Sequence, residues 1–228
     1  MRNYLSLLFI FLVSGITLGQ TRLQDSLYND IKKYTSAIDA NPENSCAYYK
    51  RGLTKMKLKD NTGSIADYDQ AIKLKSNYDT AYNARGYSRH LLKDYTGAIK
   101  DYTKTLEINP QFYSAYSNRA FSKFALKDYK GSMEDYTKVI ELAPMSNLAT
   151  AAYYYRGIDK YWLSDFKGGI EDLDKVIKLY PKDGLALLNK GNCKFKMGDK
   201  EGACADWKKA DELGQKNAKE VLGKYCGR

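Results

Sequence analysis

Apolar and polar positions alternate along this chain with the period of an α-helix, in segments of similar length that follow one another in pairs. Within a segment, apolar side chains stand three or four positions apart, which places them on one helix face. Each pair divides at a polar corner with an aspartate, as at Lys93-Asp94-Tyr95, and aspartate accepts hydrogen bonds from free amides at helix starts. The pattern predicts helices over residues 25–40, 45–58, 61–74, 79–92, 95–108, 113–126, 129–142, 147–163, 166–179, 183–197 and 200–213.

The helix pairs are copies of one repeat. The segment from Tyr78 to Pro110 matches the segment that follows it, position for position, at a shift of 34 residues. A basic residue followed by a small one marks every copy, at Arg51-Gly52, Arg85-Gly86, Arg119-Ala120, Arg156-Gly157 and Lys190-Gly191. The markers are 34, 34, 37 and 34 residues apart, so five repeats are present, and a fixed period of this kind is typical of a repeat architecture.

These copies resemble the tetratricopeptide repeat, which has a 34-residue period with small, aromatic, alanine and proline positions in register. The register here holds alanines at Ala47, Ala81, Ala115, Ala152 and Ala186, and closing prolines at Pro110, Pro144 and Pro181. The resemblance covers roughly residues 25–214. It implies an all-α fold, a right-handed superhelical solenoid of antiparallel helix pairs.

Two positions depart from the family signature, because basic residues replace its leucine and its later tyrosine. The first is the marker itself, and the second is the column Lys55, Arg89, Lys123, Lys160 and Lys194. Helix packing should therefore be more charged than in the idealised repeat. We predict a ladder of ion pairs between neighbouring helices, formed by Arg51 with Asp67, Arg85 with Asp101, Arg119 with Asp135, and Arg156 with Asp172.

Recurring glycines and tyrosines are interpreted as packing positions. Gly52, Gly86, Gly157 and Gly191 should let the two helices of a repeat touch, and Gly63, Gly97, Gly131, Gly168 and Gly202 should do the same between repeats. Two tyrosine columns are predicted to be core, namely Tyr48, Tyr82, Tyr116 and Tyr153, and Tyr68, Tyr102 and Tyr136. The longer spacing before Tyr153 predicts one longer helix, capped by Ser146 or Asn147.

The first residues indicate export. Arg2 precedes an apolar run from Leu5 to Val13 that is shorter than the roughly 20 residues needed to span a bilayer, which is typical of a signal peptide. Small residues at Thr17 and Gly19 predict cleavage between Gly19 and Gln20. We expect an exported protein, periplasmic or secreted, with no membrane span in the mature chain.

The predicted organisation is one elongated domain. It consists of a signal peptide at 1–19, a capping half-repeat at 20–44, repeats at 45–78, 79–112, 113–146, 147–183 and 184–214, and a capping helix at 215–228. The final segment keeps Ala218, Val221, Leu222 and Tyr225 at helical spacing, so it should cover the apolar end of the fifth repeat.

Charge restricts the choice of partner. The formal net charge of +10 becomes +9 when Arg2 leaves with the signal peptide. Outside the cytosol a basic surface favours acidic peptides, anionic polysaccharide or a membrane surface, and nucleic acid is expected only if the signal peptide is not cleaved. The alternative is that the lysines are simply the solvated faces of the helices.

No catalytic chemistry is predicted. His90 is the single histidine, and the sequence has no Gly-rich phosphate loop, no Gly-x-Ser-x-Gly and no His-Glu-x-x-His, so neither enzyme activity nor a cofactor is expected. The spacing of Cys46, Cys193, Cys204 and Cys226 fits no zinc motif, so no metal site is expected.

The chain end resembles a terminal unit frequent in exported bacterial tetratricopeptide proteins, in which a cysteine of the last repeat faces one in the capping helix. The resemblance implies a disulfide between Cys204 and Cys226, with Cys193 as the competing partner for either of them. The alternative is buried thiols that act as small apolar residues. Chaperone-binding relatives have a carboxylate clamp, formed by a lysine and two asparagines on successive first helices followed by a lysine and an arginine. Here Asn118 and Asn192 occupy suitable faces singly, so we do not expect this clamp.

The resemblance places first helices on a concave face, where several residues vary between repeats. These predicted partner-binding residues are Tyr49, Lys50, Asn83, Tyr87, His90, Asn118, Phe121, Phe124, Tyr154, Tyr155, Tyr161 and Trp162. Aromatics with basic and amide neighbours are typical of recognition surfaces, although several of these rings could instead fill the groove against the next repeat.

We therefore predict a non-catalytic exported scaffold that binds a protein or an extended, acidic peptide in this groove. The ligand is expected to lie across repeats two to four, stacked on Tyr87, Phe121, Tyr155 and Trp162. The alternative function is binding of carbohydrate or a cell-envelope polymer, because aromatic rings also stack on sugar faces.

Overall fold

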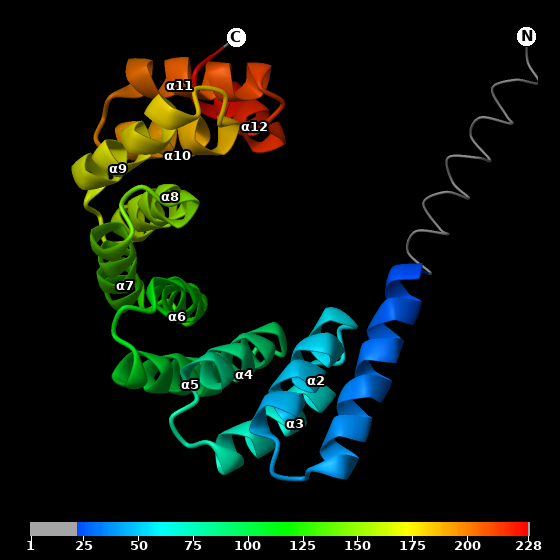
Figure 1. Ribbon diagram of the computed structural model, residues 1–228. Coiled ribbons are helices and arrows are strands. Elements are labelled where there is room, and N and C mark those ends of the chain that lie inside the picture. The colour runs from blue at the N-terminus through cyan, green and yellow to red at the C-terminus, as the bar shows by residue number, and fades with distance from the viewer. Residues whose placement is uncertain (1–21, 228) are drawn as a thin grey trace, which may run out of the picture. The chain divides into compact units, whose positions relative to one another are not determined.

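The chain is an all-α helical repeat solenoid, as the sequence predicts. The computed structural model describes residues 22–227, so the predicted signal peptide and its cleavage point lie outside the described residues. A helix covers residues 22–40 and is followed by α2 (Ser45–Lys57), α3 (Asn61–Leu74), α4 (Asp79–Leu91), α5 (Tyr95–Ile108), α6 (Tyr113–Ala125), α7 (Tyr129–Leu142), α8 (Asn147–Trp162), α9 (Phe166–Leu179), α10 (Gly184–Lys196), α11 (Lys200–Glu212) and α12 (Lys216–Tyr225) (Figure 1). The ends of the repeat helices lie within one residue of those predicted.

The chain divides into two compact units, a division that the repeat pattern does not predict. The N-terminal unit ends at Ile108 and the C-terminal unit begins at Asn109, between the second and third repeats. In a solenoid each repeat contacts only its neighbours, so few contacts hold any two halves together. Within each unit the first helices of successive repeats contact one another, α2 with α4, and α6 with α8, as Figure 1 shows for the latter pair.

Each repeat turns between its helices at a corner with one residue in the left-handed conformation. Lys59, Lys93, Lys127 and Ser164 have φ of 63–64°, and Gly198 has φ of 88° at the fifth corner. The next residue is the aspartate that caps the second helix, and in the third repeat the Asp128 carboxylate accepts a hydrogen bond from the Gly131 amide at 2.9 Å. The sequence indicates the cap but not the left-handed residue, because lysine has no preference for that conformation.

The caps also correct the interpretation of the second glycine column. A Cβ on Gly131 would overlap the Asp128 carboxylate, and the same holds for Gly63, Gly97, Gly168 and Gly202 with their own capping aspartates. These glycines therefore make room for the capping aspartate of their own helix, a role that the sequence interpretation did not give them. The first column acts as predicted, since a Cβ on Gly86 would lie 2.9 Å from Cε1 of Tyr102 on the partner helix.

One of the two tyrosine columns is fully core, and the other lies at the edge of the core. Tyr68, Tyr102 and Tyr136 are almost fully buried. The column represented by Tyr116 is only half-buried, and the guanidinium group of the marker arginine covers its ring, with 5.5 Å between the Arg119 guanidinium carbon and the Tyr116 ring centroid. The core prediction for this column therefore holds only in part, because Tyr116 and Tyr153 pack against the core but their rings lie at its edge, beside the ion-pair ladder.

The predicted arginine–aspartate ladder is present in full. In the third repeat, Nε and Nη2 of Arg119 donate to the two carboxylate oxygens of Asp135 at 2.9 and 2.7 Å. The equivalent contacts join Arg51 to Asp67, Arg85 to Asp101, and Arg156 to Asp172. The aspartates are buried, so these are not the exposed pairs of small energetic value that the sequence leaves open.

The second basic column joins the same carboxylates. Lys123 Nζ lies 2.8 Å from Asp135, and Lys55, Arg89 and Lys160 hold the corresponding positions in their repeats. Each buried carboxylate is therefore compensated by two cations from the first helix of its own repeat. In the fifth repeat the marker is a lysine, which pairs with Asp174 instead, and Lys194 alone contacts Asp206.

The marker arginine also links its repeat to the one before it. In the fourth repeat, Nη1 of Arg156 donates to the Thr137 hydroxyl on α7 at 3.1 Å. Arg51 Nη1 reaches Thr35 in the same way at 3.2 Å. Because Thr35 lies on the helix over residues 22–40, this helix occupies the place of the second helix of a preceding repeat, as the half-repeat interpretation requires.

A small polar column lies at the contact between repeats, and one repeat departs from it. The column reads Thr54, Ser88, Ser122, Asp159 and Cys193, all buried. In the N-terminal unit the Ser64 and Ser88 hydroxyls form a hydrogen bond across the contact at 2.8 Å. At the corresponding place between α7 and α8, neither the Asp159 carboxylate nor the Ser132 hydroxyl makes a hydrogen bond of acceptable geometry among the described groups. Burial raises the pKa of Asp159 to about 7, against the opposing effect of Ser132.

The buried ladder predicts unequal effects of two similar substitutions. Asp135→Asn leaves Arg119 and Lys123 without the charge that they share, so the free energy of unfolding should fall by about 3 kcal/mol. The matched control is Asp174→Asn, whose carboxylate is 50% exposed and pairs only with Lys190, and the loss there should stay below about 1 kcal/mol. Urea unfolding followed by circular dichroism measures both, and equal losses would contradict the assignment.

Asp159 predicts a pH dependence of stability. Its folded pKa of about 7 exceeds the unfolded value of about 3.9, so the folded state holds the proton more tightly. The stabilisation that protonated Asp159 gives the folded state is fully present below about pH 4. It is lost as the pH rises to about 7, and the loss is on the order of 4 kcal/mol. Asp159→Ser, which copies Ser122, should therefore gain stability over the wild type as the pH rises from 5 to 8. A difference that stays constant across this range would rule the effect out.

Candidate functional site

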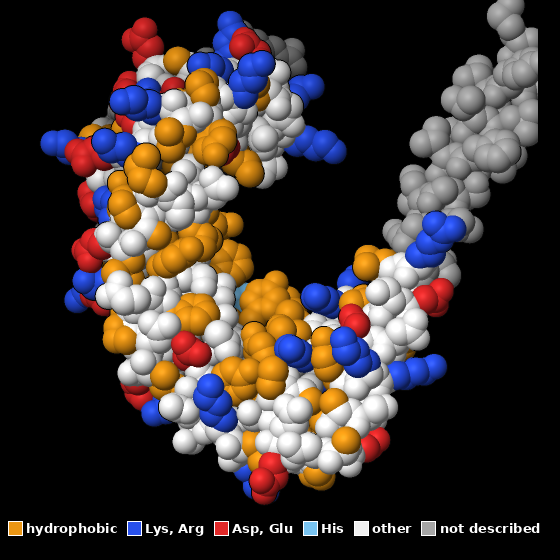
Figure 2. Space-filling model, in the orientation of Figure 1, with side chains coloured by type: hydrophobic (Ala, Val, Ile, Leu, Met, Phe, Trp, Pro, Cys, Tyr) orange, Lys and Arg blue, Asp and Glu red, His pale blue; other side chains and the backbone are white. Residues whose placement is uncertain are grey.

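An aromatic surface covers the neighbouring first helices α6 and α8 of the C-terminal unit. Phe121 on α6 is 43% exposed and Trp162 on α8 is 55% exposed. Figure 2 shows hydrophobic side chains gathered over these two helices. Exposed large apolar side chains that lie together are typical of interaction sites, whereas scattered ones are not. We call Phe121, Trp162 and the rings that support them the aromatic surface.

Neighbouring rings hold the two exposed side chains in place. The Trp162 ring stacks on Tyr129 with centroids 5.6 Å apart and an interplanar angle of 10°. Phe121 meets Tyr155 edge-on at 5.4 Å, and Tyr155 in turn stacks on the buried Tyr136 at 5.6 Å. Each exposed ring is therefore held by a neighbouring ring, and Phe121 is connected through Tyr155 to the core, which limits the conformational entropy that binding would remove.

The other predicted residues of this unit take mixed roles. Three of the predicted tyrosines are partly buried and pack against core side chains, namely Tyr154, Tyr155 and Tyr161. Part of the surface of each ring therefore serves packing, which is the alternative that the sequence leaves open. Phe124 packs edge-on against Tyr129 at 5.3 Å. Asn118 is partly buried on α6.

Five predicted residues lie in the N-terminal unit. Tyr87 is 41% exposed, Lys50 is exposed, and Asn83 is half-buried. Tyr49 lies between two rings, with centroids 6.0 Å from Tyr68 and 5.1 Å from Tyr78, and burial raises its pKa. His90 packs edge-on against Tyr95 at 5.2 Å, and burial lowers its pKa.

A hollow beside the aromatic surface was not predicted. It has a volume of about 340 Å³ and is lined by Asn147, Thr150, Ala151, Tyr154, Tyr155, Val176, Tyr180 and Asp183. Tyr180 follows α9 and Asp183 caps α10, and both lie in the loop between the fourth and fifth repeats. A large exposed ring directly before Pro181 is the sequence signal that could have drawn attention to this loop.

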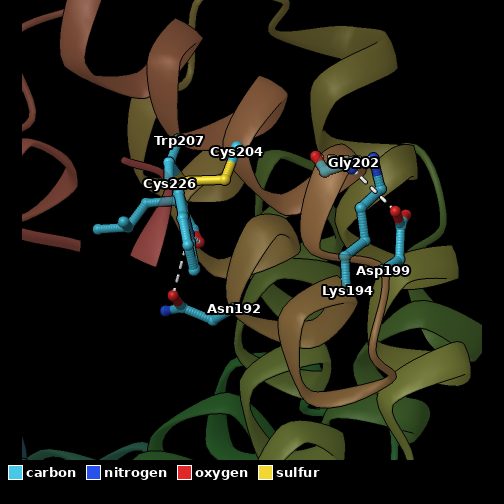
Figure 3. The surroundings of a disulfide bond; sticks show 8 residues. Asn192, Lys194, Asp199, Gly202, Cys204, Trp207 and Cys226 are labelled. Carbon is cyan, nitrogen blue, oxygen red and sulfur yellow. Dashed lines mark hydrogen bonds between the residues drawn. A yellow bond between two sulfur atoms is a disulfide. The ribbon is translucent and has the colours of Figure 1, made fainter. Parts of the chain in front are cut away.

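The C-terminal cap contains the disulfide that the family resemblance implies. Cys204 on α11 and Cys226 at the end of α12 are joined, with Cα atoms 5.8 Å apart (Figure 3). Cys193, the competing partner, is a free buried thiol whose pKa is raised by burial to about 11. Beside the disulfide, the Trp207 indole donates to the Asn192 side-chain oxygen at 3.1 Å, so the single asparagine Asn192 serves the core of the last repeat.

The described part of the chain shows neither a cluster of metal ligands nor a helix that could span a membrane. Within residues 22–227, no three histidine, cysteine, aspartate or glutamate side chains come together as metal ligands. Over the same residues, no helix combines the length and the apolar character needed to cross a bilayer. The strongest local feature is therefore the aromatic surface with its adjoining hollow.

Comparison with known sequences points to one family. Tetratricopeptide repeat families match residues 49–112, residues 113–144 and residues 185–213. These ranges fall on the first, second, third and fifth repeats of the predicted register. No curated protein matches the sequence.

Solved structures share the fold. YrrB, a tetratricopeptide repeat protein with an unusual peptide-binding site, has a TM-score of 0.76 at 19% identity, with 84% of this chain and 97% of that chain covered. MamA has a TM-score of 0.70 at 21% identity, covering 81% and 96%. A tetratricopeptide repeat protein from Parabacteroides merdae has a TM-score of 0.57 at 23% identity, covering 89% and 78%. At these identities the similarity concerns the fold.

The disulfide predicts a localised loss of stability on reduction. Its two cysteines are 22 positions apart, and closing a loop of that length stabilises by about 3 kcal/mol in the chain-entropy treatment. Cys226→Ser should therefore lower the free energy of unfolding by about this amount, with hydrogen exchange increasing first in α12. The control Cys46→Ser removes a free, exposed thiol and should leave both measurements unchanged. Uniform exchange across all helices of the Cys226→Ser variant would contradict the prediction.

Proposed function

This chain is a tetratricopeptide repeat protein, and we propose that it is an exported, non-catalytic scaffold that binds an extended segment of a partner protein. The observation that carries the proposal is the aromatic surface on α6 and α8. Phe121 and Trp162 are exposed there, and packing does not require a ring at either position, since the Phe121 column has another ring only at Tyr87 and the Trp162 column has no other. Large rings with few rotatable bonds, held by their neighbours, are the side chains that contribute most to protein–protein affinity.

The geometry of the two first helices supports an extended ligand. Phe121 and Trp162 lie on neighbouring helices and are each braced by a further ring, Tyr155 and Tyr129. A segment that crosses from α6 to α8 could bury both exposed rings at once. YrrB, which shares this fold, has a peptide-binding site, and this likeness supports the same class of ligand here.

Charge supports the expected character of the partner. The net charge of +9 that remains once Arg2 has left with the signal peptide attracts segments of net negative charge at long range and raises their association rate. The acidic ligand expected from the sequence is therefore retained as part of the proposal. Nucleic acid is not proposed, because it is expected only if the signal peptide is not cleaved, and export is part of this proposal.

Export is proposed from the predicted signal peptide and is supported by the disulfide. A disulfide between Cys204 and Cys226 persists in an oxidising compartment and is rare in the cytosol. The proposed location is the periplasm or the extracellular medium, after cleavage between Gly19 and Gln20.

Carbohydrate or cell-envelope polymer is the second candidate ligand. Trp162 stacks on Tyr129 through one face of its ring, and rings in this arrangement can offer the other face to a sugar. Retention of the protein on purified cell-wall material, with no protein captured, would favour this candidate over a peptide.

The proposal predicts that two exposed rings dominate binding. The partner would be captured from the native envelope fraction, identified by mass spectrometry, and its bound segment titrated by calorimetry. Phe121→Ser with Trp162→Ser should weaken the dissociation constant by well over tenfold, because central aromatic contacts contribute about 2 kcal/mol or more each. Tyr155 is left intact because it supports Tyr136, and its removal would also disturb the core.

The matched control removes exposed apolar side chains elsewhere. Met145→Ser with Met197→Ser takes away two side chains that are exposed but lie outside the aromatic surface, and binding should not change. Unaltered binding by a well-folded Phe121/Trp162 variant would place the site on another surface.

A further inference from the structure

We propose that the hollow between α8 and the loop before α10 binds one cationic side chain, a lysine or arginine, of the partner segment. The inference deepens the proposed function, on which it rests, by naming a specificity pocket next to the aromatic surface. The pocket is lined by three tyrosine rings and one carboxylate, from Tyr154, Tyr155, Tyr180 and Asp183. This combination attracts a cation through the ring faces and through the negative charge together.

The other lining groups fit the same ligand. Asn147 and Thr150 add polar side chains at one edge, and Ala151 and Val176 add apolar surface against which an alkyl stem can pack. No lysine or arginine is among the residues that line the hollow. At about 340 Å³ the hollow falls within the usual range for small ligand pockets, roughly 300–1,000 Å³.

Two of the three rings are fixed before any ligand arrives. The Tyr154 hydroxyl accepts a hydrogen bond from the Asn189 side-chain amide at 3.1 Å. Tyr155 stacks on the buried Tyr136 and meets Tyr154 edge-on at 5.2 Å. Preformed ring positions reduce the ordering cost of binding, and the ring faces attract a cation electrostatically.

The Asp183 carboxylate is available for a cation. One of its oxygens accepts a hydrogen bond from the Ala186 amide at 2.9 Å, as the N-cap of α10. No ion pair joins it to a basic side chain among residues 22–227, although its chain neighbour Lys182 borders the adjoining hollow over residues 179–183. In contrast, the aspartates of the ladder are compensated by two cations in four of the repeats.

The fold does not require an aspartate at this place. The N-cap positions of the other first helices are Asn44, Tyr78, Phe112 and Ser146, so a carboxylate occurs at this position only before α10 in the described repeats. Tyr78 and Phe112 show that a first helix forms without any side-chain cap. The charge of Asp183 is therefore an addition to the scaffold, placed at a hollow that three tyrosines also line.

The pocket can be tested with small probes and without the natural partner. The purified protein is titrated with N-acetyl-lysine N-methylamide while the backbone amide signals of Asn147, Thr150 and Asp183 are followed by nuclear magnetic resonance. N-acetyl-norleucine N-methylamide, which has the same four side-chain carbons but lacks the ammonium group, is the neutral probe. The lysine probe should bind at least about fivefold more tightly, which is the scale of one cation–π contact. Equal affinities would overturn the proposal, because the hollow would then be merely apolar.

Variants separate the charge from the fold. Asp183→Asn keeps the helix cap, since asparagine caps as well as aspartate, and should weaken binding of the lysine probe while leaving binding of the norleucine probe unchanged. Tyr180→Leu, which removes an exposed ring, should weaken the lysine probe about threefold or more. The matched control is Asp199→Asn, a capping aspartate of α11 outside the pocket, which should leave probe binding unchanged. An Asp183→Asn protein that binds the lysine probe as the wild type does would overturn the inference.

The two proposals fail in different ways. Loss of partner binding in the Phe121/Trp162 variant tests the aromatic surface and does not involve the lysine probe. If the probe binds through Asp183 but partner affinity does not depend on Phe121 and Trp162, the pocket is supported and the proposed peptide site is overturned. If the partner depends on those rings but the probe does not distinguish lysine from norleucine, the pocket is overturned and the proposed function is supported.

Discussion

A buried carboxylate shared by two cations is the interaction on which the repeats depend. Asp135 is held by Arg119 in a two-bonded pair and by Lys123 from the next turn of the same helix. A buried ion pair adds little net stability over a well-packed apolar contact, but removing one partner is costly. The ladder therefore sets the register between the two helices of a repeat, and the third nitrogen of the arginine, as in Arg156 with Thr137, extends that register to the preceding repeat.

Because the ladder and the buried rings of the second helices settle the packing, the first helices can vary on their other side. Phe121 and Trp162 are exposed on that side without being needed for the core, and Tyr155 connects Phe121 to the core through Tyr136. Recognition and stability are thus carried by different columns of the same helix. This separation explains how one repeat pattern can support surfaces of different chemistry along the chain.

Two carboxylates depart from their columns, and their consequences differ with burial. Asp159 replaces the serine or threonine found in the first three repeats, and it lies fully buried between α7 and α8 with no hydrogen bond of acceptable geometry among the described groups, so it makes the contact sensitive to pH. Asp183 replaces an uncharged N-cap and faces a hollow lined by rings. The first is a cost to stability at neutral pH, and the second is an available charge at the surface.

The sequence by itself determined the repeat, the helix bounds and the partners of the ladder, because each depends on spacing within a helix or between two adjacent helices. The pair of Arg51 and Asp67 recurs at a fixed interval along the chain, so the two columns could be predicted to lie side by side. Only the tertiary structure decided the rest. It showed that Gly131 makes room for the Asp128 cap, that Tyr116 lies under a guanidinium group, and that Tyr180 and Asp183 meet α8. These contacts depend on the direction that a loop takes and on the rotamers of the side chains. Neither produces a periodic pattern in the sequence from which it could be predicted.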